Sequence, residues 1–241
     1  METAIMFLRW LHIAAGFTAF VVAPCAMISR KGGEAHRRWG KIFFWSMATV
    51  ALTAIIIAAY RPIIFLLLVA VFSFYSAFTG YRVLYRKRPD KGQRATSLDW
   101  SAALMTVAGS ATLIVLGLFA PSVLRISPII ALVFGILGII LAGRDLKKFI
   151  RPPAQKSQWF IDHLGGMLGA YLAAVSAFSV VNFDFLPTVV RWLWPTAIGT
   201  PGIFIWINYY QKKFRKGAEA SQVATVRIGM KKEVGRLEYA D

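Results

Sequence analysis

Residues 42–81 read IFFWSMATVALTAIIIAAY-R-PIIFLLLVAVFSFYSAFTGY, with Arg61 as the one charged residue of the stretch. A single helix of this length would measure about 60 Å, roughly twice the hydrocarbon core of a bilayer, at a rise of about 1.5 Å per residue. Pro62 disfavours helix at the residue before it. The stretch therefore predicts two membrane-crossing helices joined by a tight hairpin at Arg61 and Pro62.

Apolar stretches of this kind recur along the 241 residues. A membrane-crossing helix needs about 20 mostly apolar residues, and charge, proline or glycine marks its ends. Seven stretches meet this need: 5–28, 42–60, 62–81, 98–120, 126–143, 162–182 and 189–210. We expect an all-α, polytopic membrane bundle of seven transmembrane helices over residues 1–210, followed by a flexible basic tail over 211–241.

The chain carries 28 Lys and Arg against 11 Asp and Glu, a net charge of +17, although only 16% of its residues are charged. In a soluble protein this charge would indicate nucleic-acid binding. Here 24 of the 28 basic residues lie in 30–41, 82–94, 144–156 and 212–236. Basic connections stay in the cytoplasm, so we expect the N-terminus outside, the C-terminus in the cytoplasm, anionic lipid at the basic inner face, and no nucleic-acid partner.

Ionisable residues inside a membrane segment are costly and are therefore candidates for function. Arg9 and His12 lie three residues apart on one face of the first stretch, close to its outer end. Two interpretations stay open. Arg9 reaches the surface while a carbonyl satisfies His12, or the two residues form an outer polar cluster that contacts a ligand.

Four further candidates are expected near the inner face: His36, Asp99, Asp162 and His163. His36 lies just before the second stretch, Asp99 lies at the start of the fourth, and Asp162 with His163 opens the sixth. Thr96 and Asp99 also fit a capping box, in which the carboxylate would stabilise a helix start and bind no ligand.

A haem would need two histidines at the same membrane depth, because each axial nitrogen must approach one iron to about 2 Å. His12 is excluded, since the helical rise places it roughly 20 Å from the others. His36 and His163 are the pair that remains for a b-type haem, and with Asp99 or Asp162 the same pair fits a divalent metal. Cys25 is the single cysteine, which excludes a disulfide and a paired-cysteine metal site.

The seventh stretch contains Pro195, Gly199, Pro201 and Gly202. A helix broken at these residues would expose backbone groups that coordinate a substrate or an ion. A proline kink, in which neighbouring helices satisfy the freed carbonyls, is the alternative.

Several short blocks of this sequence occur together in one known family. They are LHI (11–13), KGGEAHRRWG (31–40), GYR (80–82), LDW (98–100), DH (162–163), GAY (169–171), VN (181–182) and PT (195–196). Over roughly residues 8–210 the chain resembles the bacterial multi-pass membrane proteins grouped as domain of unknown function 2306. The resemblance implies a bacterial cytoplasmic (inner) membrane location and implies no mechanism.

These observations favour a protein that transports or binds a small ligand through His36, Asp99, Asp162 and His163 near the cytoplasmic face. A membrane redox protein that holds a b-type haem or a quinone between the two histidines is the first alternative, and a structural or assembly subunit is the second. The sequence contains no nucleophile with a base, no phosphate-binding glycine loop and no dense carboxylate cluster. These absences argue against a hydrolase or an ATP-driven machine, and leave open whether the chain is an enzyme.

Overall fold

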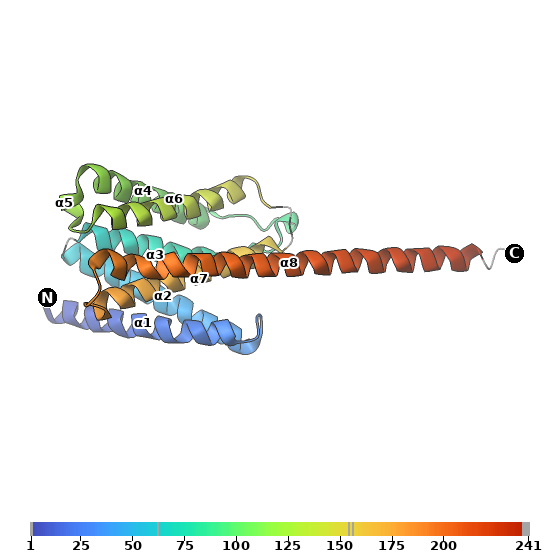
Figure 1. Cartoon of the computed structure of the whole chain (residues 1–241), viewed down its shortest axis with the longest axis horizontal. Coiled ribbons are helices and arrows are strands. Elements are labelled where there is room, and N and C mark those ends of the chain that lie inside the picture. The colour runs from blue at the N-terminus through green and yellow to red at the C-terminus, as the bar shows by residue number, and fades with distance from the viewer. Residues whose placement is uncertain (1, 62, 154, 156, 238–241) are drawn as a thin grey trace. The chain divides into compact units, whose positions relative to one another are not determined.

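The computed structural model describes residues 2–61, 63–153, 155 and 157–237, and their side chains as far as residue 216. The described residues form helices and no strand (Figure 1). In chain order the elements are α1 (Glu2–Ile28), α2 (Glu34–Tyr60), α3 (Ile64–Arg82), η1 (Val83–Tyr85), η2 (Pro89–Lys91), α4 (Ser97–Phe119), α5 (Pro121–Leu124), α6 (Pro128–Ile150), α7 (Gln158–Asn182) and α8 (Thr188–Leu237).

Within the described residues, six helices are long and apolar enough to span a membrane: α1, α2, α3 continued through η1, α4, α6 and α7. They correspond to the first six predicted stretches, and they make the chain a multi-pass membrane protein. The seventh predicted stretch lies in α8, which is not among the six. Two prolines, two glycines and Arg191 lower the mean hydropathy there, so a seventh span stays a prediction.

The hairpin predicted between residues 42–60 and 62–81 is present. Helix α2 ends at Tyr60, where the Arg61 amide donates to the Ile57 carbonyl at 2.9 Å, and α3 begins at Ile64. Pro62 lies outside the described residues. The interpretation of two helices, rather than one very long helix, is confirmed.

Several helices extend beyond their apolar stretches into the basic segments. Helix α2 begins at Glu34, eight residues before the predicted 42, and α6 continues to Ile150, seven residues after the predicted 143. Charged residues that the sequence assigns to connections therefore lie on helix ends, where the neighbouring helices can contact them. This difference decides where the candidate site forms.

Helices α1, α2, α3 and α7 form a ring, in which α1 packs on α2, α2 on α3, α3 on α7 and α7 on α1. Helices α4 and α6 pack on each other and against α3 (Figure 1). The closest approach in the ring is between glycines: a Cβ on Gly166 would lie 2.7 Å from the Gly80 Cα. Only glycine at both positions lets α3 and α7 approach this closely.

Helix α8 is continuous through Pro195 and Pro201, so of the two interpretations of the seventh stretch the broken helix is wrong. A proline removes one backbone donor but does not have to interrupt a helix whose freed carbonyls find other partners. Helix α8 also continues to Leu237, through most of the predicted tail; residues 238–241 lie outside the described residues. Contacts divide the chain into two units, 1–201 and 202–241, and all candidate site residues belong to the first.

Candidate functional site

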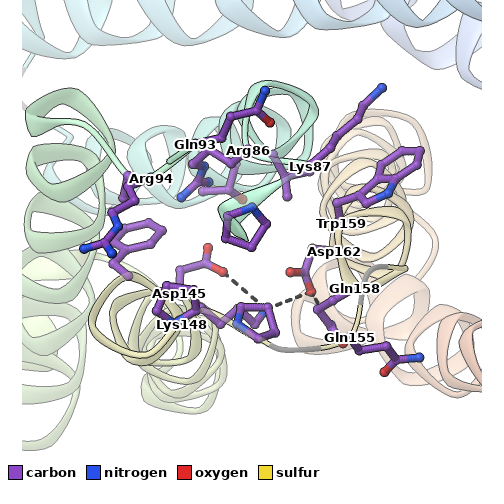
Figure 2. Close-up of a pocket in the computed structure, with 17 residues that line it drawn as sticks. Arg86, Lys87, Gln93, Arg94, Asp145, Lys148, Gln155, Gln158, Trp159 and Asp162 are labelled. Carbon is purple, nitrogen blue, oxygen red and sulfur yellow. Dashed lines mark hydrogen bonds and ion pairs between the residues drawn. The ribbon is translucent and has the colours of Figure 1, made fainter. Parts of the chain in front are cut away.

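A cavity of about 80 Å³ lies where α3 and α6 end and α7 begins, which we call the basic end of the first unit (Figure 2). Side chains from α3, the segment after η1, α6, the α6–α7 connection and α7 line it. Its ionisable lining residues are Arg86, Lys87, Arg94, Asp145, Lys148 and Asp162. Four of these six are cationic, so the wall of the cavity carries excess positive charge.

Both carboxylates of the cavity are engaged by neighbouring side chains. Lys148 Nζ donates to Asp162 Oδ1 at 2.8 Å and lies 3.6 Å from Asp145 Oδ1, as the dashed lines of Figure 2 show. The Tyr75 hydroxyl donates to Asp145 Oδ2 at 2.9 Å, and Gln158 Nε2 donates to Asp162 Oδ1 at 2.8 Å. These contacts join α3, α6 and α7 into one polar network. The carboxylate charge is thereby largely compensated within the protein.

Asp99 lies at the start of α4, is 2% exposed, and does not line the cavity. It accepts from Arg82 Nε at 3.1 Å and from Arg82 Nη2 at 2.9 Å, a bidentate ion pair, and from the Thr96 amide at 2.9 Å. The predicted capping box is therefore present. Asp99 holds the end of α3 against the start of α4, and its lone pairs are used within the protein.

Arg86 is the cavity residue whose bonding is incomplete. Its side chain is 13% exposed, its Nη2 lies 3.8 Å from Asp99 Oδ1, and its Cζ lies 4.7 Å from the centre of the Phe149 ring. Its Nε is buried and has no hydrogen-bond partner among the described residues. A buried donor without an acceptor costs about 1–3 kcal/mol. The arrangement thus leaves one donor of a cavity-lining side chain unsatisfied.

The two inner histidines lie close together, as a shared membrane depth requires. Their ring centres are 6.2 Å apart, with the ring planes at 79°. His36 Nδ1 is 2.9 Å from the Ala26 carbonyl of α1, and His163 Nδ1 is 2.7 Å from the Gly80 carbonyl of α3. Because a carbonyl oxygen only accepts, each Nδ1 carries the proton and each Nε2 presents a lone pair.

The glycine-rich loop before α2 closes the C-terminal end of α1. The last carbonyls of a helix lack partners within the helix, and cationic donors satisfy them. Lys31 Nζ donates to the Met27 carbonyl and lies 3.4 Å from the Ala26 oxygen, to which His36 also donates. Burial lowers the pKa of Lys31 from its ordinary value. The block KGGEAH thus fixes the position of His36 by anchoring both of its basic ends to α1.

At the opposite end, near the start of α1, His12 is satisfied by α2. Its Nδ1 lies 3.1 Å from the Val50 carbonyl and 3.0 Å from Thr53 Oγ1. Arg9 is exposed, and no hydrogen bond or ion pair joins it to His12 within the described residues. Of the two interpretations of the pair, the structure agrees with a histidine bonded to a carbonyl.

The four residues predicted near the inner face thus lie in three different places. His36 and His163 face each other, Asp162 lines the cavity, and Asp99 belongs to the ion pair with Arg82. Sequence reasoning missed five residues that complete the polar network: Tyr75, Arg82, Arg86, Asp145 and Lys148. One signal was visible, since Asp145 is the one acidic residue in the basic segment 144–156.

Among the described residues, no group of three or more His, Cys, Asp or Glu is placed to hold a metal ion. The combination of both histidines with Asp99 or Asp162 is therefore not formed. Compared with known proteins, the chain matches no family model, no curated protein and no solved structure. The chemistry of the basic end has to be argued from its own geometry.

Proposed function

We propose that the chain is a transport or ligand-binding protein of the bacterial cytoplasmic membrane, and that its cavity at the basic end takes a small anion. The observation that carries the proposal is the buried Arg86 Nε, a donor without an acceptor at the wall of a predominantly cationic cavity. An anion bound there would supply the missing acceptor. A guanidinium is well suited to this role, because its planar donors match carboxylate and phosphate oxygens.

The balance of charge supports an anion over a cation. Lys148 pairs with both Asp145 and Asp162, and Arg86 lies 3.8 Å from Asp99 outside the cavity wall. Lys87 and Arg94 make no ion pair with the described residues. The positive potential of such a concave wall attracts anions. A cation would have to displace Lys148 to reach either carboxylate.

The size of the cavity limits the ligand. A volume of about 80 Å³ holds roughly five to eight water-sized groups, at about 10–15 Å³ for each. Inorganic phosphate or a short carboxylic acid fits this space. Two further lining residues, Gln93 and Trp159, add an amide and an aromatic ring to the wall.

The distribution of basic residues supports a cytoplasmic position for this end. In the proposed topology, α8 supplies the seventh span through residues 189–210, the N-terminus is outside, and the C-terminus is inside. The basic end then faces anionic lipid and cytoplasmic metabolites. Fusion of reporter enzymes to the 82–94 segment and to the α2–α3 hairpin would test this orientation, because only the first should report a cytoplasmic location.

The experiment that tests the proposed function measures the thermal stability of the full-length protein in detergent. Inorganic phosphate, sulfate, acetate and succinate are added in turn, with glucose as the uncharged control. We expect at least one anion to raise Tm in the wild type, because a ligand that binds the native state stabilises it.

Arg86→Gln should lose this increase. Arg88→Gln is the matched control: the residue lies two positions away, is exposed, and does not line the cavity. Equal Tm increases in Arg86→Gln and in the wild type would overturn the assignment of Arg86, and no increase with any of the anions would overturn the proposed ligand class.

A further inference from the structure

The second polar feature of the basic end is the histidine pair inside the ring of four helices. Helices α2 and α7 both pack on α1 and on α3, so they occupy opposite corners of the ring. His36 lies in the first turn of α2, and His163 lies in the second turn of α7. The two imidazoles therefore approach each other from opposite sides of the bundle.

Both imidazoles are held in the tautomer that a metal requires. The carbonyls of Ala26 and Gly80 accept the two Nδ1 protons, and neither Nε2 makes a hydrogen bond to the described residues. Histidines that bind metals commonly donate the other ring nitrogen to a carbonyl, which orients the ring and raises the basicity of the ligating nitrogen. The Gly80 carbonyl is itself fixed by the close contact between Gly80 and Gly166.

The separation of the rings distinguishes between two kinds of coordination. With metal–nitrogen distances of about 2.0 Å, two imidazoles in line through one metal have ring centres roughly 6.3 Å apart, whereas a tetrahedral angle brings the centres to roughly 5.2 Å. The observed 6.2 Å between the ring centres is compatible with the in-line arrangement and longer than the tetrahedral one. A metal bound in this way needs its other ligands in the plane between the rings.

The described residues do not supply those ligands, since no third His, Cys, Asp or Glu joins the pair. A porphyrin supplies four nitrogens in that plane and asks the protein for two axial ligands only. We propose that His36 and His163 are the axial ligands of a b-type haem bound between α2 and α7. This site is separate from the anion cavity, because neither histidine lines that cavity.

The surroundings of the pair suit a porphyrin. Gly40 lies one turn after His36 on the same face of α2, and a Cβ added there would meet no atom within 4 Å. Trp39 and Met167, each three or four residues after a histidine, are partly buried apolar neighbours.

The test uses the full-length chain, purified in detergent after expression with added haem precursor and then titrated with haemin. We expect one haem per chain and the sharp Soret band of a six-coordinate, bis-imidazole iron. His36→Ala and His163→Ala should each lose the low-spin spectrum and weaken haemin binding at least tenfold. His12→Ala, at the other end of the bundle, should keep the wild-type spectrum.

Loss of a histidine could also act through folding, so a rescue experiment accompanies these variants. His163→Gly should regain the low-spin spectrum when imidazole is added, because the free base can replace the missing ligand. Retention of the low-spin spectrum in the double variant His36→Ala with His163→Ala would overturn the proposal. So would a wild-type protein that binds no haemin, including one that carries a quinone in its place.

Discussion

The ionisable side chains at the two ends of the first unit differ in their bonding partners. At the start of α1, His12 is bonded by Val50 and Thr53 of one neighbouring helix, and Arg9 is exposed. At the basic end, charged side chains from three helices bond to one another around a cavity, and one buried donor, Arg86 Nε, has no partner among the described residues. A polar residue in a membrane helix is thus a weak indication of function by itself. A buried unpaired donor on a cavity-lining side chain, such as Arg86 Nε, is a stronger one; Arg191 Nε is also buried and unpaired among the described residues, but Arg191 does not line this cavity.

The largest effect on stability should come from the ion pair that supports the basic end. Asp99→Ala leaves the partly buried Arg82 and Arg86 without their carboxylate, and removal of one partner of a buried pair costs about 3–5 kcal/mol. Arg9→Ala, at the opposite end, should change the free energy of unfolding by less than about 0.5 kcal/mol. Denaturant unfolding in detergent compares the two variants. Equal losses in the free energy of unfolding would mean that the ion pair at the basic end stabilises the protein no more than the exposed Arg9 does.

The next largest effect should come from the glycine contact between α3 and α7. A Cβ on residue 166 would lie 2.9 Å from the Ser76 carbonyl oxygen and closer still to Gly80, so Gly166→Ala has to move backbone and should cost about 1–3 kcal/mol. Gly143→Ala is the matched control on α6, because a Cβ there meets nothing within 4 Å. A Gly166→Ala protein as stable as the control would contradict the observed packing.

The helices and part of the candidate site could be predicted from the sequence. Hydropathy located six of the spans, and Pro62 separated two helices that could have been counted as one. Helix ends were harder to predict, since α6 continues for seven residues beyond its apolar stretch. That extension brings Asp145 and Lys148 to α3 and α7, a long-range contact that no local pattern encodes.

The histidine pair was easier to predict than the cavity. The number of residues from each histidine to the end of its helix predicts its depth in the membrane, and His36 and His163 were predicted at the same depth. The role of Arg86 depends on which partners surround it after folding. The segment 82–94 was understood as a marker of orientation, and the bidentate pairing of Arg82 with Asp99 could not be inferred from its spacing.

A smaller effect should follow the loss of one hydrogen bond at the basic end. Tyr75→Phe removes the donor to Asp145 Oδ2 and should cost about 1–2 kcal/mol of stability, because the acceptor is a carboxylate. The variant also leaves the Asp145 carboxylate beside the cavity without its neutral donor, so anion affinity should fall severalfold. Thermal unfolding with and without phosphate measures both quantities. Unchanged stability would show that the hydroxyl makes no such bond.

The smallest of these stability losses should follow removal of the contact between Thr53 and His12, at the end where α1 starts. Thr53→Val removes one of the two partners of His12 Nδ1 and should cost about 1 kcal/mol, since the Val50 carbonyl remains. Anion affinity should not change. A fall in affinity equal to that of Tyr75→Phe would mean that the two ends are coupled.

The most direct test of the account is a calorimetric titration of the full-length protein with the anion that raises its Tm most. We compare the wild type with Arg86→Gln and with Arg9→Gln, one arginine from each end. We expect at least tenfold weaker binding in Arg86→Gln and wild-type affinity in Arg9→Gln. Equal affinities in all three proteins would contradict it, because the unpaired donor at the basic end would then have no part in binding.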